Sequence, residues 1–293
     1  MTDLRQTPQY ASYMKSQGWI AEAIRLKPSS QVFCYIKRLP FFPFSVMKVQ
    51  RFEVFSDLDL LLSVARQYRC ISVTLEPGLS FHRSEDEINQ FLSRYHFRPA
   101  RWPLLPSKTL EVNLKRSHDT LFLALSKDAK SSVNKSRRLC TVRILEHREA
   151  EFLSRFYAFW RQHGRGYIPS RSEFFQLLSS FKNRSFVVTV SKKKDDSDLL
   201  AGTVILQSDK SAYYYYAFVS SLGRKSSAGY LALWESMMES KRRLSISFDF
   251  EGIYDDRYPR LKRWKGFSFF KKKFGGDEVL YPGVYTRYLF PGL

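Results

Sequence analysis

Hydrophobic positions in the first hundred residues fall into short apolar runs and longer helix-like periods. The pattern favours a helix over residues 6–18, because Thr7 is a suitable cap, Pro8 fits the first turn and Gly18 follows the end. Ser84 and Glu87 have the spacing of a capping box, which indicates another helix start. The predicted elements are, in order, a helix at 6–18, strands at 32–36 and 52–55, a helix at 57–68 capped by Ser56, a strand at 70–75 that completes a βαβ-like unit, and a helix at 84–95.

Three prolines separate this half of the chain from a second series of elements. Pro99, Pro103 and Pro106 fall within residues 98–108, which we interpret as a linker. The elements expected after it are a strand at 109–114, a helix at 119–138, a strand at 141–145, helices at 149–163 and 172–181, strands at 186–191, 200–207 and 211–219, a helix at 228–240, and strands at 245–250 and 279–289. This order predicts an α/β (α+β) protein of two similar mixed units rather than one doubly wound sheet.

The composition is that of a folded protein with a substantial core. The chain has 293 residues, of which 44% are hydrophobic and 16% aromatic. No apolar run approaches the ~20 residues that span a bilayer, and the N-terminus lacks the apolar core of a signal peptide. We therefore expect a cytoplasmic protein whose membrane contacts would be peripheral. Cys34, Cys70 and Cys140 lie far apart among apolar neighbours, which predicts buried free thiols rather than a disulfide or metal site.

The sequence is strongly basic, with 48 Lys and Arg against 28 Asp and Glu and a formal net charge of +20. The charge is concentrated in two segments, which attract polyanions such as phosphate backbones, pyrophosphates or anionic lipid headgroups. A solvated basic surface is the alternative interpretation of each. The first segment contains Lys127, Lys130, Lys135, Arg137, Arg138 and Arg143, and the second contains Arg257, Arg260, Lys262, Arg263, Lys265, Lys271, Lys272 and Lys273.

The sequence lacks the usual catalytic motifs, including a nucleophile elbow, a phosphate-binding loop, a zinc-binding H-E-x-x-H and a cysteine–histidine pair. An enzyme of this kind would depend on positioning and on cations that stabilise developing charge. The best candidate site is the acidic, glycine-containing strand end at 249–253 with the aromatic and basic segment at 264–276. A lysine among phenylalanines there is placed to stabilise an oxyanion. By alternation alone, a surface strand with phenylalanines toward the core and lysines toward water is favoured.

A series of motifs follows in order along nearly the whole chain. It begins with Gln6-Thr7-Pro8 and Gly18-Trp19 and continues through Glu76-Pro77 and the segments 106–114, 127–142, 201–203, 213–216 and 230–238. Its two most specific members are Asp249-Phe250-Glu251-Gly252-Ile253 and Phe270-Lys271-Lys272-Lys273-Phe274-Gly275-Gly276. With these motifs in this order, the sequence resembles the FemABX family of peptidoglycan bridge-forming peptidyltransferases.

The resemblance implies two tandem domains related to the GNAT (acyl-CoA N-acyltransferase) fold, here without the inserted coiled-coil arm of some members. The domains are expected at 1–107, completed by the C-terminal strand 279–293, and at 108–278. The implied reaction moves an amino acid from aminoacyl-tRNA to an amine of a peptidoglycan-precursor stem peptide. The precursor is UDP-linked or lipid-linked. Aminoacyl-tRNA is then a co-substrate, and neither a cofactor nor a metal is expected.

The resemblance also assigns roles to individual residues. Lys271 matches a lysine that stabilises the oxyanion, with Phe270 beside it. Arg171 matches an arginine that holds precursor phosphate, and Phe174 or Phe175 stands in place of its tyrosine companion. The other expected substrate-binding residues are Lys15 (or Met14, without a shift of one residue), Glu76 and Tyr216. The residues expected to attract RNA are Arg263, Lys265, Lys272 and Lys273.

Departures from the family pattern leave two other functions open. Asn113 stands for an acid, Phe218 for a small residue and Lys273 for a glycine. One alternative is a GNAT-like enzyme that uses acyl-CoA, for which residues 221–229 are the nearest approach to a pyrophosphate loop. The other is a non-catalytic protein that binds nucleic acid or an anionic membrane through its basic clusters.

Overall fold

The computed structural model describes residues 2–27, 30–52, 58–79, 84–164, 167–193 and 195–289. The chain divides into two compact units. The N-terminal unit comprises Thr2–Lys108 and the C-terminal residues from Leu280, and the C-terminal unit comprises Thr109–Val279. The domain boundaries expected from the sequence, after residues 107 and 278, lie one residue before these two divisions.

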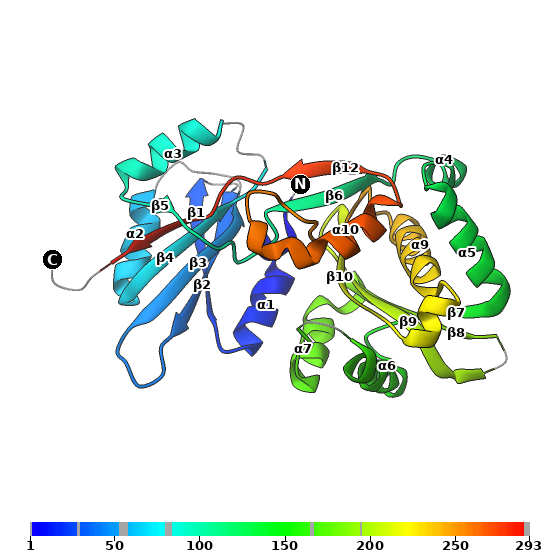
Figure 1. Cartoon of the computed structure of the whole chain (residues 1–293). Coiled ribbons are helices and arrows are strands. Elements are labelled where there is room, and N and C mark those ends of the chain that lie inside the picture. Colours follow the sequence, from blue (N-terminus) through cyan, green and yellow to red (C-terminus); the bar gives the residue numbers. More distant parts are fainter. Residues whose placement is uncertain are drawn as a thin grey trace. The chain divides into compact units, whose positions relative to one another are not determined.

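The N-terminal unit is built on a six-stranded sheet of order β1-β2-β3-β4-β13-β5 (Figure 1). Strands β3 and β4 are parallel and are joined by helix α2, so a βαβ unit is present as predicted, although its first strand begins earlier in the sequence than expected. Met47 of β3 and Leu75 of β4 pack with Leu62 of α2 in the core of this unit. The elements are η1 (Leu4–Gln6), α1 (Pro8–Ser16), β1 (Ile20–Lys27), β2 (Ser30–Arg38), β3 (Ser45–Phe52), α2 (Leu58–Gln67), β4 (Cys70–Pro77), α3 (Glu85–Arg94), β5 (Arg98–Pro99) and β13 (Tyr285–Tyr288).

Local capping chemistry sets two helix starts in this unit. The Thr7 hydroxyl accepts a hydrogen bond from the Tyr10 amide at 3.2 Å at the start of α1. Ser84 and Glu87 form the reciprocal capping box of α3, as predicted. Strand β1 was not predicted. The strand predicted at 52–55 was expected to begin at Phe52, but β3 ends there. Residues 53–57, which include the expected Ser56 cap, lie outside the described residues.

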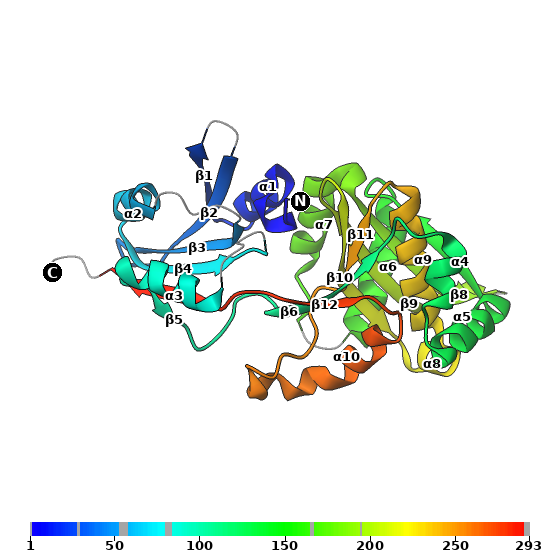
Figure 2. The same cartoon turned by 90° about the horizontal axis from the view of Figure 1, so that it is seen from above.

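The C-terminal unit is built on a seven-stranded sheet of order β12-β6-β11-β10-β9-β8-β7. Strand β11 pairs antiparallel with β6, and β10, β9, β8 and β7 pair antiparallel in turn, whereas β10 and β11 are parallel. Helices α5 and α9 cover one face and α6 and α7 the other (Figures 1 and 2). The elements are β6 (Lys108–Asn113), α4 (His118–Leu123), α5 (Lys127–Leu139), β7 (Cys140–Leu145), α6 (Ala150–His163), α7 (Arg171–Phe181), η2 (Lys182–Arg184), β8 (Ser185–Lys192), β9 (Asp195–Gln207), β10 (Ser211–Val219), α8 (Ser221–Lys225), α9 (Ala228–Arg242), β11 (Ser247–Asp249), η3 (Pro259–Trp264), α10 (Lys265–Lys272) and β12 (Asp277–Leu280).

Three predicted elements of the C-terminal unit differ from the structure. The helix expected at 119–138 is two helices, because Ser117 caps α4 and Ser126 caps α5. The surface strand favoured by alternation around Phe270 is wrong, since α10 is helical to Lys272. The strand expected at 279–289 is two short strands, β12 and β13, separated by a segment that contains Pro282 and Gly283.

Replacing each of two glycines of the C-terminal unit by alanine is expected to change the free energy of unfolding in opposite directions. A Cβ at Gly223 would lie 2.0 Å from the Leu200 carbonyl oxygen, whereas one at Gly266 would meet nothing within 4 Å. We expect Gly223→Ala to lower the free energy of unfolding by about 1–3 kcal/mol. Gly266→Ala, within α10, is expected to raise it by about 0.5–1 kcal/mol. Urea unfolding of both variants checks the pair, and equal effects would contradict this packing.

The remaining general expectations concern the membrane and the cysteines. Among the helices that the structure describes, none combines the length and the apolar character needed to cross a bilayer. Cys34, Cys70 and Cys140 are all buried and free, as predicted. Within the described ranges, no group of three or more His, Cys, Asp or Glu side chains is arranged to hold a metal ion.

Candidate active site

Lys271 is a buried lysine whose ammonium is bonded to the main chain. Its side chain leaves the last turn of α10, and the whole residue is 7% exposed. The Nζ donates to the carbonyl oxygens of Phe250 and Gly252, each at 2.7 Å. The same Nζ lies 4.8 Å from the centre of the Phe267 ring and 5.7 Å from that of Tyr214. The helix therefore delivers one cation to an aromatic, largely dry position.

The two carbonyls are available to Lys271 because β10 and β11 separate. The strands pair over only three residues each, Ser211–Tyr213 with Ser247–Asp249. Beyond this point β10 bulges between Tyr214 and Tyr216, and the chain after β11 leaves the sheet. Glu251 and Gly252 both have positive φ, 56° and 102°, which turns the segment so that two of its carbonyls meet one ammonium. Lys271 thus fills the gap where the sheet opens.

A buried carboxyl group fixes the same turn from the other side. Asp249 accepts hydrogen bonds from the Thr109 hydroxyl and, at 2.7 Å, from the Glu251 amide. The Thr109 hydroxyl also accepts from the Gly252 amide at 3.1 Å. Strand β6 therefore holds the turn through Thr109, and the turn holds Lys271. This network explains why β11 ends in an acid and is followed closely by a glycine.

Burial shifts the titration of both charged groups toward neutrality. Desolvation lowers the pKa of Lys271 to about 8, against the opposing effect of the Glu251 and Asp249 carboxylates. Desolvation also raises the pKa of Asp249 to about 7, and the Glu251 charge adds to this rise. Lys271 is therefore an ammonium at neutral pH and loses its proton as the pH rises through about 8. Two of its three N–H groups bond to the carbonyls, which leaves one for a further acceptor.

Phe270 lies beside Lys271 on α10 and belongs to the packing of that helix. Its ring meets Tyr230 of α9 edge-on at 4.9 Å and Phe274 at 5.5 Å between ring centres. Half-buried against the core, it anchors α10 to α9. In the structure, Phe270 therefore helps to position Lys271.

The residues expected to attract RNA are divided by their surroundings. Lys272 forms an ion pair with Glu278, and Lys273 donates to Asp128 at 3.1 Å. These acids neutralise much of the charge that RNA would meet there. Arg263 and Lys265 are exposed, and the Lys265 ammonium lies over the Tyr254 ring at 4.8 Å. Of the four, Arg263 and Lys265 remain the better candidates for attracting phosphate.

Arg171 stands at the first position of α7 and is held from two sides. Its Nη2 donates to the Ser154 hydroxyl of α6 at 2.9 Å, and its guanidinium lies 5.5 Å from the Phe175 ring centre. Phe174 points the other way and is fully buried, stacked on Phe156 and Tyr157. A substrate would not reach Phe174, so this residue is a packing residue. Phe175 is the aromatic neighbour of Arg171.

Tyr216 lies on β10 and faces α6 rather than Lys271. Its ring centre is 4.8 Å from that of Trp160. Tyr214, two residues earlier, is the tyrosine that faces the Lys271 ammonium. Burial raises the pKa of Tyr214 well above its ordinary value, so its hydroxyl stays protonated. The sequence did not distinguish the four consecutive tyrosines, because the bulge between them sets which ones share a face.

Glu76 has a structural task in the N-terminal unit. Its carboxylate accepts from the amides of Leu104 and Leu105 at 2.7 and 2.8 Å and from the Gln50 side chain at 2.9 Å. It is 4% exposed, so it orders the proline-rich segment instead of forming an open polar wall. Glu76 therefore does not have the open position that the expected direct contact with substrate requires.

The lysine expected on α1 is not matched by a buried cation at that place. Lys15 is exposed and Met14 is 4% exposed in the core. This unit has a partly buried lysine, Lys48 on β3, which was not predicted. Its Nζ lies over the Trp19 ring at 4.5 Å, and burial lowers its pKa to about 8. In the sequence, its position between apolar residues was the signal that could have indicated burial.

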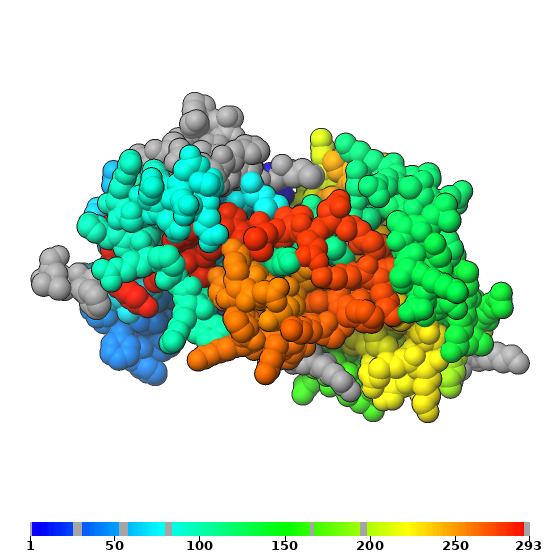
Figure 3. All heavy atoms as spheres, turned by 45° about the horizontal axis from the view of Figure 1, so that its top comes forward, coloured from blue at the N-terminus to red at the C-terminus, as the bar shows by residue number. Residues whose placement is uncertain are grey.

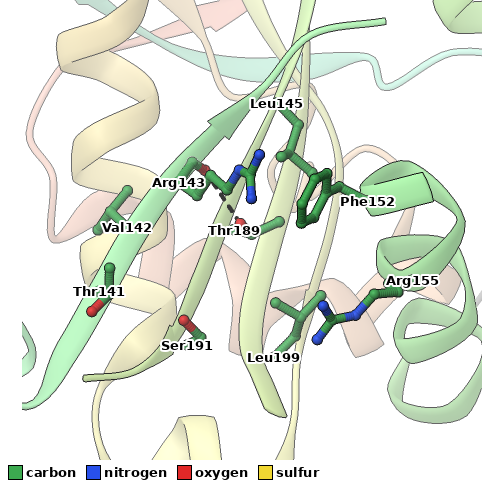
Figure 4. A pocket seen from close by; sticks show the side chains of 9 residues that line it. All are labelled: Thr141, Val142, Arg143, Leu145, Phe152, Arg155, Thr189, Ser191 and Leu199. Atoms are coloured by element: carbon green, nitrogen blue, oxygen red, sulfur yellow. Dashed lines mark hydrogen bonds between the residues drawn. The ribbon is translucent and has the colours of Figure 1, made fainter. Parts of the chain in front are cut away.

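A pocket of about 250 Å³ in the C-terminal unit lies between strands β7–β9 and helix α6 (Figure 4). Arg143 points into it from β7, beside Thr189, and Arg155 reaches in from α6, beside Leu199. Arg143 forms an ion pair with Glu149, the residue before α6, and its guanidinium lies 3.5 Å from the centre of the Phe152 ring. The expected site residues are not among its lining side chains in the described part of the chain.

The segment closest in sequence to a pyrophosphate loop has its glycines turned inward. The missing side chain at Gly223 faces the Leu200 carbonyl, and a Cβ at Gly229 would lie 2.8 Å from Val219. Residues 221–225 form the short helix α8. These glycines therefore allow close packing of α8 and α9 on the sheet, and they do not form an open cradle for phosphate.

Comparison with known proteins places this geometry in a wider context. Residues 124–260 match the family model of the acetyltransferase (GNAT) domain. No curated protein matches the sequence. The crystal structure of FemX superposes with a TM-score of 0.81 at 14% identity, covering 98% of this chain and 92% of FemX.

Two further solved structures share the fold. The C-terminal domain of an Agrobacterium fabrum protein, named as a lysylphosphatidylglycerol synthetase, has a TM-score of 0.63 at 12% identity and covers 97% of this chain and 88% of its own. A tandem GNAT protein from the clavulanic acid biosynthesis pathway has a TM-score of 0.53 at 11% identity, with 91% and 82% covered. The chain therefore has a FemABX-like tandem GNAT fold. Together with the family model, this fold supports acyl transfer as the class of reaction.

Proposed function

We propose that this FemABX-like fold carries an aminoacyltransferase that moves an amino acid from aminoacyl-tRNA to an amine of a peptidoglycan-precursor stem peptide. The observation that carries the proposal is the buried Lys271 ammonium, held by two main-chain carbonyls with one N–H left to donate. The net charge of +20 suits a tRNA substrate, because phosphate neutralisation supplies most of the affinity for RNA. Since charged tRNA is a substrate, we place the reaction in the cytoplasm.

The chemistry requires no covalent enzyme intermediate. The acceptor amine attacks the ester carbonyl carbon of the aminoacyl-tRNA, so a C–N bond forms and the carbonyl oxygen becomes an oxyanion. The remaining N–H of Lys271 donates to that oxyanion in a position from which water is largely excluded. As the intermediate collapses, the C–O bond to the ribose breaks. Over the whole reaction, the amine loses one proton and the ribose oxygen gains one.

Substrate positioning is assigned to residues other than Lys271. Arg171, with Phe175 beside it, offers a charged fork for the phosphate of the precursor. Tyr216 and Lys15 stay proposed contacts, while Phe270, Phe174 and Glu76 act through packing and loop order. Arg263 and Lys265 are proposed to meet the tRNA. UDP-linked and lipid-linked precursors carry the same pyrophosphate chemistry, and both are proposed acceptors.

A GNAT-like enzyme that uses acyl-CoA is the second candidate, and the acetyltransferase family model over residues 124–260 favours it. The inward-turned glycines of 221–229 weigh against it. The mass of the acceptor distinguishes the two. We expect a UDP-linked stem peptide, incubated with the protein, a charged tRNA pool and acetyl-CoA, to gain one amino-acid residue. A gain of one acetyl group would establish the second candidate, and an unchanged mass would contradict both.

A further inference from the structure

A groove of about 560 Å³ opens on the C-terminal unit where α5 ends, β8 ends and α8 begins. In Figure 2 the ribbons of α5 and α8 lie side by side, and in Figure 3 green and yellow atoms adjoin in this part of the unit. No residue of α10 contributes to it, so this α5–α8 groove is separate from the Lys271 site. Its lining residues are Arg138, Leu139, Cys140, Lys192, Lys193, Leu200, Leu222, Lys225 and Ser226.

The floor of the α5–α8 groove is aliphatic and partly open to water. Leu139 is 50% exposed and Leu222 is 48% exposed, while Leu200 and Cys140 are buried beneath them. Single exposed leucines are ordinary on protein surfaces. Two that share one concave apolar floor with a polar rim are typical of an interaction site. The groove thus presents apolar area that nothing in the unit covers within the described residues.

The rim of the same groove is basic. Arg138, Lys192, Lys193 and Lys225 all line it, and no acidic side chain does so among the described residues. The Lys135 ammonium adds a fifth cation, because it donates to the Lys225 carbonyl at 3.1 Å. Cations so close together repel one another, and an anionic partner relieves that repulsion.

The backbone around the α5–α8 groove is held in place, so the arrangement exists before any partner arrives. The Lys193 amide donates to the Leu139 carbonyl at 3.2 Å, which joins the end of α5 to the end of β8. The Ser226 hydroxyl donates to the Leu222 carbonyl at 3.2 Å and closes α8. The segments that carry the leucines and the cations are therefore joined on one face of the unit.

We propose that the α5–α8 groove docks this protein on the anionic surface of a lipid bilayer. Leu139 and Leu222 enter the boundary of the acyl chains, and the rim cations meet the lipid phosphates. Charge complementarity and the aliphatic floor together select this partner. RNA would use the cations but not the leucines, and the groove offers no aromatic ring on which bases stack.

The experiment measures sedimentation of the full chain with phosphatidylcholine vesicles, with and without phosphatidylglycerol. We expect binding only to the anionic vesicles. Removing four rim cations, in R138Q/K192Q/K193Q/K225Q, should weaken it by at least about 100-fold, since each cation near an anionic surface contributes about five-fold. The matched control K115Q/R161Q/K182Q/K210Q removes the same charge from exposed positions of the same unit and should weaken it much less.

The apolar floor is tested separately. L139S/L222S should weaken vesicle binding by at least ten-fold, whereas L123S/L244S, at leucines 70% and 83% exposed elsewhere in the unit, should not. L139S/L222S should also keep wild-type transfer to a soluble UDP-linked acceptor, which separates this proposal from the proposed reaction. No binding of the wild type to anionic vesicles would overturn the proposal. The proposal would also be overturned if L139S/L222S bound anionic vesicles as tightly as the wild type while the variant without the four rim cations lost tRNA binding. That result would assign the groove to RNA.

Discussion

Replacement of Lys271 by methionine is expected to lower the rate of aminoacyl transfer by about 10²–10³-fold, the usual cost of removing one oxyanion donor. Methionine keeps much of the aliphatic length of the lysine but cannot donate to an oxyanion. It also leaves the carbonyls of Phe250 and Gly252 without their present donor. Each such buried group costs about 1–3 kcal/mol, so the variant should also unfold at a lower temperature. Single-turnover rates well below that temperature separate the two effects.

Two neighbouring variants serve as controls for Lys271. Lys272→Met changes the adjacent, exposed lysine of the same helix and should leave the rate within a few-fold of wild type. Lys271→Arg keeps the charge and some of the hydrogen bonds to the carbonyls. Compared with Lys271→Met, it should therefore regain more of the stability than of the transfer rate. Equal rates for Lys271→Met and wild type would remove Lys271 from the reaction. An equal loss in Lys272→Met would show that the helix, rather than the buried ammonium, is what matters.

Replacement of Arg171 by alanine is expected to raise the KM for a UDP-linked acceptor by about 10- to 100-fold with a small effect on kcat, since a charged hydrogen bond contributes about 1.5–3 kcal/mol. The guanidinium is exposed at the start of α7 and is oriented by Ser154 and the Phe175 ring. Steady-state kinetics with a varied acceptor measure the effect.

The control for Arg171 is Arg161→Ala, an exposed arginine at the end of α6. It should leave the KM unchanged. An acceptor that lacks the pyrophosphate should show no difference between Arg171→Ala and wild type. A loss of kcat alone in Arg171→Ala would contradict a phosphate-binding role.

Local signals in the sequence predicted much of the fold. Thr7 and the Ser84–Glu87 pair mark true helix starts because their side chains satisfy amides of their own first turn. The sequence around α10 does not distinguish a strand from a helix by alternation, because phenylalanines and lysines in close succession fit both. Phe267 and Phe270 are three residues apart, which is a helical spacing, and both lie within α10 in the structure.

The site depended on contacts that local patterns do not contain. The partners of Lys271 are main-chain atoms about twenty residues earlier, exposed only because two strands separate. The ion pair of Lys273 with Asp128 joins residues 145 apart, so the charge cluster in the sequence is less cationic in the structure. The resemblance singled out Lys271, and the structure shows that its ammonium is buried and bonded to two main-chain carbonyls.

The most direct test of the central claim follows the ester bond of labelled aminoacyl-tRNA in the presence of the protein, with and without a stem-peptide amine. Direct attack by the amine predicts that the label leaves the tRNA only when the amine is present, appears in an amide of the acceptor, and never becomes attached to the protein. An intact ester in the presence of the acceptor, while acetyl-CoA is consumed in its place, would contradict the claim.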